Sequence, residues 1–274
     1  MGSTVTRTLP ALGALLALLA LAGSSGAASK VGIGKMTVTP NRLTAGSPGN
    51  ELTFTFTADS AALSGRMLVD VPRGWSLPQR TSPAGAGYVE LQPSGCTTAT
   101  RITGIVGRRI TITVVCARRH LFRMLYRHAT APPLSADGYV FLTQTRPSGA
   151  AKKVVFLPLG PRKQPVVRIR GGAASALFMT STSVASVGVG FAATVRAIDP
   201  FGNNAVDYAG AVTLSSTDPS ATLPPAYTYG PVDTAQHVFT GVVLRTPGTQ
   251  RIVATDSAGH SVQSGPITVS APSS

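Results

Sequence analysis

Short segments of the chain alternate apolar and polar residues with a period of two. In residues 52–57 every second position is Leu or Phe, and the positions between them are Thr. Residues 110–116 alternate in the same way, so Cys116 shares the apolar face of its segment with Ile110 and Ile112. Successive side chains of a strand point to opposite faces of its sheet, so this period predicts strands with one face in a core.

The same alternation recurs along the chain, and no long stretch has helical periodicity. Turn-forming clusters rich in Gly, Pro, Asn and Ser separate the alternating segments, as at residues 41–50 and 81–87. Many short strands at this spacing are typical of a sandwich or barrel. We therefore expect an all-β chain that forms a sandwich or barrel. The other alternating segments are residues 67–71, 122–127, 139–141, 154–156, 166–169, 191–197, 212–214, 239–244 and 252–254.

A stretch rich in proline and glycine, residues 157–175, divides the chain. It contains a short predicted strand, residues 166–169, which is followed by Gly171 and Gly172. Stretches of this composition are typical of linkers between domains. The sequence predicts a first module at residues 31–170 and a second module at residues 174–270, with the boundary at these glycines.

The N-terminus has the layout of a secretory signal peptide. Arg7 precedes an apolar run of twelve residues, Ala11 to Ala22, and small residues follow as far as Ala28. A retained membrane anchor is the alternative, but a helix that spans a bilayer needs about 20 apolar residues. We expect a signal peptide at residues 1–28, cleaved after Ala27 or Ala28, and a mature protein that is secreted and has no membrane span.

Charge is distributed unevenly between the two modules. Residues 30–170 hold 20 of the 24 Lys and Arg residues and five acidic residues, a net charge of +15. Residues 171–274 hold three Arg and five Asp, a net charge of −2. An asymmetry of this size suggests two distinct modules and assigns any polyanionic partner to the first.

The chain has two cysteines, Cys96 and Cys116. In an exported protein such a pair indicates a disulfide rather than a metal site or a catalytic thiol. The bond closes a loop of about 20 residues and is expected to stabilise the first module by about 3 kcal/mol.

Six arginines lie within twenty residues of one another around the strand that Cys116 ends. We expect a hairpin in which the first two begin one strand, the next two occupy the turn and the last two project from the outer face of the return strand. Two interpretations stay open: a soluble face that keeps strand edges from aggregating, and a binding surface for an anionic partner. The six are Arg108, Arg109, Arg118, Arg119, Arg123 and Arg127.

The sequence has no motif that indicates catalysis. Neither a Gly-x-Ser-x-Gly elbow nor a His-Glu-x-x-His segment occurs, so we expect no catalytic residue and no cofactor. Asp199, Asp207 and Asp256 are the candidate calcium ligands, but they lie in no dense ligand loop. We interpret them as turn residues and expect no metal. Trp75, which follows a Pro-Arg-Gly turn, is interpreted as core rather than as a sugar-binding platform.

The second module resembles the bacterial Ig-like repeat of secreted and surface proteins, including invasin- and intimin-type adhesins. The resemblance covers nearly all of residues 174–270 and implies an Ig-like sandwich that acts as a stalk, spacer or adhesive unit, with no catalytic residue to carry over. Such repeats usually occur in tandem arrays, whereas this chain has one copy. The matching residues are Val195-x-Ala197-x-Asp199-x-Phe201-Gly202-Asn203, Tyr208-x-Gly210-x-Val212-x-Leu214-x-Ser216-x-Asp218-Pro219, and Leu244-x-Thr246-x-Gly248-Thr249-Gln250-x-Ile252-x-Ala254-x-Asp256.

The first module is similar, more loosely, to the N-terminal Ig-like modules of bacterial secreted proteins. The similarity rests on Gly49-Asn50-x-Leu52-Thr53-Phe54-x-Phe56 and Val71-Pro72-x-Gly74-Trp75. The two resemblances imply an all-β protein with two Ig-like β-sandwich domains in tandem after a signal peptide. We therefore expect a non-enzymatic secreted bacterial protein that acts as an interaction, adhesion or structural spacer module. Its alternatives are a binder of polyanions or carbohydrates that acts through the first module, and a secreted hydrolase. An exported chain favours an acidic envelope polymer or glycan as the partner, not a nucleic acid.

Overall fold

The computed structural model describes residues 31–149 and 155–271. This part of the chain consists of short β-strands and two short 3-10 helices, η1 and η2. The signal peptide predicted at residues 1–28 lies outside the described residues. Within the described ranges, no helix is long and apolar enough to cross a membrane.

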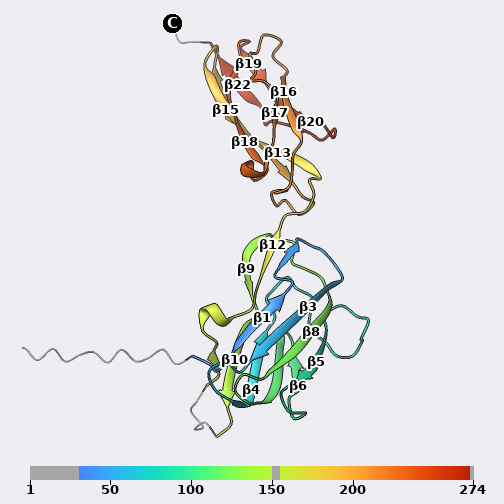
Figure 1. The fold of residues 1–274 in the computed structure, drawn as a ribbon. Coiled ribbons are helices and arrows are strands. Elements are labelled where there is room, and N and C mark those ends of the chain that lie inside the picture. The colour runs from blue at the N-terminus through green and yellow to red at the C-terminus, as the bar shows by residue number, and fades with distance from the viewer. Residues whose placement is uncertain (1–30, 150–154, 272–274) are drawn as a thin grey trace, which may run out of the picture. The chain divides into compact units, whose positions relative to one another are not determined.

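The first module forms three sheets. The larger two have the strand orders β1-β3-β8-β5 and β11-β10-β4-β7-β6, and a small sheet has the order β2-β12-β9 (Figure 1). The elements are β1 (Lys35–Thr39), β2 (Arg42–Thr44), β3 (Asn50–Thr57), β4 (Leu63–Asp70), β5 (Tyr88–Ser94), β6 (Arg101–Val106), β7 (Arg109–Cys116), β8 (Leu121–Ala129), β9 (Ala136–Val140), β10 (Leu142–Pro147), β11 (Leu157–Pro158), η1 (Pro161–Lys163) and β12 (Val166–Arg170).

The predicted period of two is confirmed in the core of the first module. Leu52, Phe54 and Phe56 of β3 are at most 1% exposed, and the threonines between them are half-buried. In β7, Ile110 and Ile112 are fully buried in the same cluster. Because β3 and β7 belong to different sheets, their apolar faces meet in one core between the two layers of a sandwich.

The second module has its own three sheets, with the orders β13-β15-β18, β14-β22-β19 and β17-β16-β20-β21. β14 pairs in parallel with β22, while the other pairings of this module are antiparallel. The elements are β13 (Ala176–Thr180), β14 (Val184–Ser186), β15 (Gly190–Ile198), β16 (Ala211–Ser216), β17 (Tyr227–Thr228), η2 (Pro231–Asp233), β18 (Gln236–Val243), β19 (Gly248–Gln250), β20 (Ile252–Asp256), β21 (Ser261–Gln263) and β22 (Ile267–Ser270).

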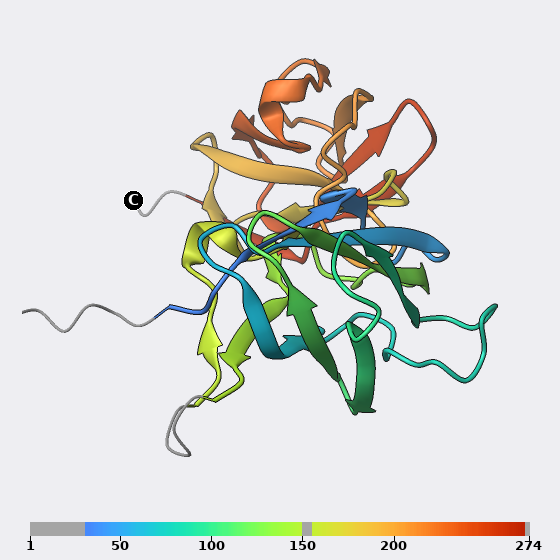
Figure 2. The ribbon, with the colours of Figure 1, turned by 60° about the horizontal axis from the view of Figure 1, so that its bottom comes forward.

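The buried apolar residues form two separate clusters. One contains residues between 36 and 169, and the other contains residues between 177 and 269. No sheet combines strands from both modules, as the colours of Figures 1 and 2 allow the reader to follow. The fold class is therefore the one predicted, all-β with Ig-like β-sandwiches.

The predicted hairpin around the arginine cluster is wrong. β7 pairs with β4 and β6, whereas β8 pairs with β3 and β5 in the opposite sheet. Residues 117–120 therefore cross from one layer of the sandwich to the other. The physical reason is that both strands carry an apolar face, and placing them in opposite layers buries both faces against each other.

Candidate functional site

The crossover between β7 and β8 separates the six arginines of the cluster. Arg108 lies in the turn before β7 and Arg109 begins that strand. Arg118 and Arg119 lie on the crossover, and Arg123 and Arg127 lie on β8. The six arginines therefore lie on two different sheets and on the connections next to them, rather than on one face of a hairpin. Their individual contacts show which of them are available to a ligand.

Arg108 has a structural role. Its Nη1 donates hydrogen bonds to the carbonyl oxygens of Pro72 and Trp75, at 2.8 and 3.0 Å. Trp75 is 2% exposed, and its ring centroid lies 5.2 Å from that of Phe141. The interpretation of Trp75 as a core residue is confirmed, and Arg108 holds the loop that carries it.

Arg109 and Arg127 are paired with carboxylates. The Arg109 guanidinium binds both oxygens of Asp70, with Nε–Oδ1 at 2.7 Å and Nη2–Oδ2 at 3.0 Å, and this hydrogen bonding raises the pKa of Arg109. Arg127 Nη2 lies 2.9 Å from Oε1 of Glu90, and its Nε lies 3.7 Å from Oε2 of Glu51. The charges of both arginines are therefore offset locally.

The remaining three, Arg118, Arg119 and Arg123, are here named the crossover arginines. All three side chains are exposed, and none forms an ion pair with a carboxylate of the described residues. The backbone of Arg119 has φ of 68°, and its N–H donates to the carbonyl of Ala58 at 2.7 Å, which fixes the turn. Arg123 Nη1 donates to the hydroxyl of Ser94 at 3.2 Å. These three present uncompensated positive charge at one end of the sandwich.

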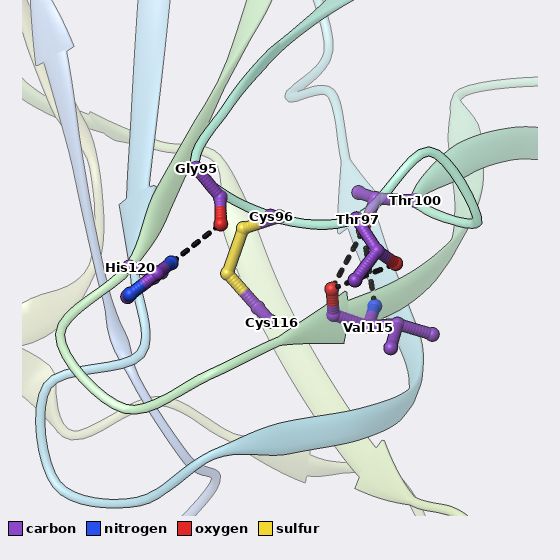
Figure 3. The surroundings of a disulfide bond; sticks show 7 residues. All are labelled: Gly95, Cys96, Thr97, Thr100, Val115, Cys116 and His120. Carbon is purple, nitrogen blue, oxygen red and sulfur yellow. Dashed lines mark hydrogen bonds between the residues drawn. A yellow bond between two sulfur atoms is a disulfide. The ribbon is translucent and has the colours of Figure 1, made fainter.

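A disulfide anchors the start of the crossover (Figure 3). Cys96 follows β5 in one sheet and Cys116 ends β7 in the other, so the bond ties the two layers together at this end. Next to it, Val115 accepts a hydrogen bond from the N–H of Thr97 at 3.0 Å, and its own N–H donates to the hydroxyl of Thr100 at 3.0 Å. The segment that carries the crossover arginines therefore starts at a strand end that the disulfide and these hydrogen bonds hold in place.

Sequence reasoning missed a second group of arginines. Arg146 of β10 pairs with Arg66 of β4, Arg66 pairs with Thr113 of β7, and Thr113 pairs with Arg101 of β6. The three arginines form one row across the outer face of the sheet; we name it the arginine row. They lie far apart along the chain, so only the strand register brings them together.

The aspartates of the second module close turns, as predicted for Asp199 and Asp256. Oδ1 of Asp199 accepts from the N–H groups of Phe201 and Asn203, both at 2.9 Å. Oδ1 of Asp256 accepts from the N–H groups of residues 258 and 260, at 2.9 and 2.8 Å. Burial raises the pKa of each carboxyl, but hydrogen bonds, led by those from Asn203 and His260, outweigh it and lower the pKa below the ordinary range. Asp207 is exposed.

The arrangement of these acids points to turn stabilisation rather than to chemistry. In the part of the chain that the structure describes, no group of three or more His, Cys, Asp or Glu is placed to hold a metal. Asp256 Oδ2 accepts from Tyr208 and lies 2.9 Å from His260 Nδ1, as a carboxylate orients a histidine in a catalytic triad. No hydroxyl among the described residues is hydrogen-bonded to the His260 ring, and the N–H of His260 also bonds Asp256, which closes the turn.

Comparison with known proteins shows no family. No protein-family model matches this sequence, and no curated protein matches it. Among solved structures, the chain is similar to the adhesin InvE of Yersinia pseudotuberculosis, with 11% identity, a TM-score of 0.29, and coverage of 86% of this chain and 58% of that one. It is also similar to the Escherichia coli adhesin FdeC, with 15% identity, a TM-score of 0.38, and coverage of 89% and 65%.

The similar structures also include an enzyme. β-Glucuronidase 3 of Bacteroides uniformis matches with 10% identity, a TM-score of 0.30, and coverage of 86% of this chain and 25% of that one. This chain thus spans 58% and 65% of the length of the two adhesins and a quarter of the enzyme. What the chain binds is therefore inferred from its own residues.

Proposed function

We propose that this chain is a secreted bacterial protein without catalytic activity that acts as an extracellular interaction, adhesion or spacer module. Its sandwich architecture, the signal-peptide pattern of residues 1–28 and the resemblance of residues 174–270 to invasin- and intimin-type repeats support this role. A secreted hydrolase has less support, because the Asp256–His260 pair is occupied in closing a turn.

A second, more specific candidate is the binding of an acidic polymer by the first module. The observation that carries this candidate is that the first module has too few carboxylates to pair with its arginines and lysines. Of the five acidic residues in this module, Asp70 pairs with Arg109, Glu51 and Glu90 pair with Arg127, and Asp59 pairs with Lys163 at 2.8 Å. The pairing leaves most of the +15 charge of residues 30–170 without a local counter-ion.

The crossover arginines are the first candidates for polymer contacts. They are exposed and clustered, and they lie on a segment held by the disulfide and by the Ala58–Arg119 hydrogen bond. A surface that is ordered before it binds loses less conformational entropy on binding. A linear polyanion laid over this end of the sandwich would contact all three side chains while the second module serves as a spacer.

The test compares the mature chain with a variant carrying R118Q, R119Q and R123Q. We expect retention on dextran sulfate but not on dextran, and weaker retention as salt rises, because exposed charges are screened over about 8 Å at physiological ionic strength. Three lost contacts of about 0.5 kcal/mol each should lower the affinity about tenfold. Equilibrium binding measured across a salt series checks this expectation.

A matched control removes the same charge elsewhere on the first module. Arg42, Arg168 and Arg170 are exposed residues of β2 and β12, so R42Q, R168Q and R170Q together change the net charge equally. This control should retain most of the binding. Equal losses in both variants would assign the effect to net charge alone, and equal retention on dextran and dextran sulfate would leave a spacer with a basic surface.

A further inference from the structure

The arginine row contains two arginines directly opposite each other. Arg66 and Arg146 are register partners on the antiparallel strands β4 and β10, and both lie on the outer face of the sheet. Cβ atoms of such partners are about 5 Å apart, and like charges in this position destabilise a sheet. Neither guanidinium forms an ion pair or a hydrogen bond with a described side chain. The pair therefore concentrates two positive charges that no ion pair of the described residues compensates.

The same two residues line a hollow. It has a volume of about 290 Å³ and is lined by Gly65, Arg66, Arg146, Pro147, Ser148 and Gly149. Ser148, another lining residue, carries a hydroxyl that can donate a hydrogen bond. Among the described residues, the lining includes two arginines and a serine and no carboxylate, so the hollow is suited to a small anion.

The backbone around the hollow is held in place by a close approach of two strands. A Cβ at Gly65 would lie 2.1 Å from the carbonyl oxygen of Arg146, so only glycine permits this contact. The N–H of Ser148 donates to the carbonyl of Ser64 at 2.6 Å and continues the pairing beyond β10. Both arginines therefore project from fixed backbone positions, which favours a preorganised site.

We propose that the hollow between Arg66 and Arg146 binds a tetrahedral oxyanion, the sulfate or phosphate group of an acidic polymer. One guanidinium saturates the two oxygens of a carboxylate, whereas two guanidinium forks match the three or four oxygens of a sulfate or phosphate. This inference rests on the polymer-binding function proposed above and names its ligand group and a second contact surface.

Arg101 extends the site along the arginine row. It lies two strands from Arg66, with Thr113 between them. Strands in a sheet are about 4.8 Å apart, so the two arginine positions are separated by about 10 Å. A polymer that places one anionic group in the hollow and runs across the strands would bring a second anionic group to Arg101, about 10 Å away.

The direct test is a titration of the mature chain with inorganic sulfate and, separately, with inorganic phosphate at constant ionic strength. NMR signals of the Arg66 and Arg146 side-chain N–H groups should shift in a saturable way with at least one of the two anions. Sodium acetate at the same ionic strength should produce a smaller shift. Identical, non-saturating shifts with all three salts would show general screening and overturn the site.

Substitutions separate the site from a general effect of net charge. R66Q or R146Q should weaken oxyanion binding at least tenfold, and R168Q, a matched change of an exposed arginine on β12, should leave it unchanged. In chloride buffer R66Q should also raise the Tm, because it removes the repulsion between the paired arginines. A lower Tm in R66Q would show that the pair has a structural role and would overturn the proposal.

Dextran sulfate then distinguishes the failure of this inference from the failure of the polymer-binding function. Polymer binding that survives R66Q and R146Q but is lost in the crossover variant overturns the oxyanion site alone. The absence of any preference for dextran sulfate over dextran overturns the polymer function, while saturable sulfate or phosphate binding would still support the site. The comparison of the two anions decides whether the group is a sulfate or a phosphate.

Discussion

Asp218 is a buried aspartate of the second module whose carboxylate accepts four hydrogen bonds. The residue is 3% exposed. Its Oδ2 accepts from the N–H groups of Arg245 and Thr246, at 2.6 and 3.0 Å, and its Oδ1 accepts from the Thr246 hydroxyl and the Ser220 N–H, at 2.7 and 2.9 Å. Burial alone raises the pKa of this carboxyl, but these bonds, led by the Thr246 hydroxyl, lower the pKa to about 2.

We predict that Asp218 makes the second module sensitive to acid. Its folded-state pKa, about 2, lies below the ordinary aspartate pKa of 3.8. The unfolded chain therefore binds the proton more readily, so the stabilisation is present above about pH 4 and is lost as the pH falls towards 2. D218N should lower the free energy of unfolding at pH 7 by about 1–3 kcal/mol and flatten its dependence on pH between 4 and 2. Urea unfolding followed by second-module amide signals checks this.

D207N is the control for this prediction. Asp207 belongs to the same module and is exposed, so its substitution should change the stability by less than about 0.5 kcal/mol. If D218N and D207N show the same acid transition, the acid sensitivity of the module has another source.

At the residue scale, sequence predicts a local role better than a distant partner. The turn roles of Asp199 and Asp256 were predictable because the donors lie within four residues. The partners of Arg108 and Arg109 were not, because they lie more than thirty residues away and come close only through strand pairing. The sequence motif of the second module includes Asp218, but its donors in residues 245–246 were likewise beyond local reasoning.

At the scale of strands, the period of two identified which side chains face the core but not which sheet each strand joins. β8 shows the predicted alternation, with Phe122, Met124 and Tyr126 at most 1% exposed. The short segment 117–120 is as compatible with a tight hairpin as with a crossover. Only the pairing of β8 with β3 and β5 distinguishes the two, and this pairing depends on contacts between residues distant in sequence.

The disulfide is the element-scale feature with the clearest energetic consequence. Cys96 and Cys116 connect strand ends from opposite layers, with a Cα–Cα distance of 4.4 Å. We predict that C96S/C116S lowers the stability of the first module by about 2–5 kcal/mol and leaves the second module nearly unchanged. Trp75, the only tryptophan, is buried in the first core, so its fluorescence reports the unfolding of that module during a urea titration.

Two measurements accompany the prediction about the disulfide. Mass spectrometry of unreduced peptides from the folded protein should show Cys96 linked to Cys116. The urea midpoint of second-module amide signals serves as the internal control. Freely alkylated thiols in the folded protein, or an equal loss of stability in both modules, would contradict the prediction.

At the scale of the whole molecule, charge and architecture divide at the same place. The excess of arginine belongs to the strands before Gly171, and the two apolar clusters also separate there. The change in packing and the change in charge therefore fall in the same part of the chain, between residues 169 and 177. This distribution supports the proposed division of labour, in which the basic module contacts a ligand and the other module extends or presents it.

The separate cores predict that the second module folds without the first. Residues 171–274 retain the whole apolar cluster between residues 177 and 269 and all the sheets that enclose it. They also retain Gly172, whose N–H donates to Oδ2 of Asp199 at 3.0 Å. We expect dispersed amide signals and a single cooperative melt from this fragment, because each of its buried strands keeps its partners.

A fragment starting at Ala174 lacks the bond from Gly172 and should be less stable by about 1–2 kcal/mol. An unfolded 171–274 fragment would show that the two modules depend on each other for folding. Equal stability of the two fragments would show instead that the hydrogen bond to Asp199 contributes nothing to the fold.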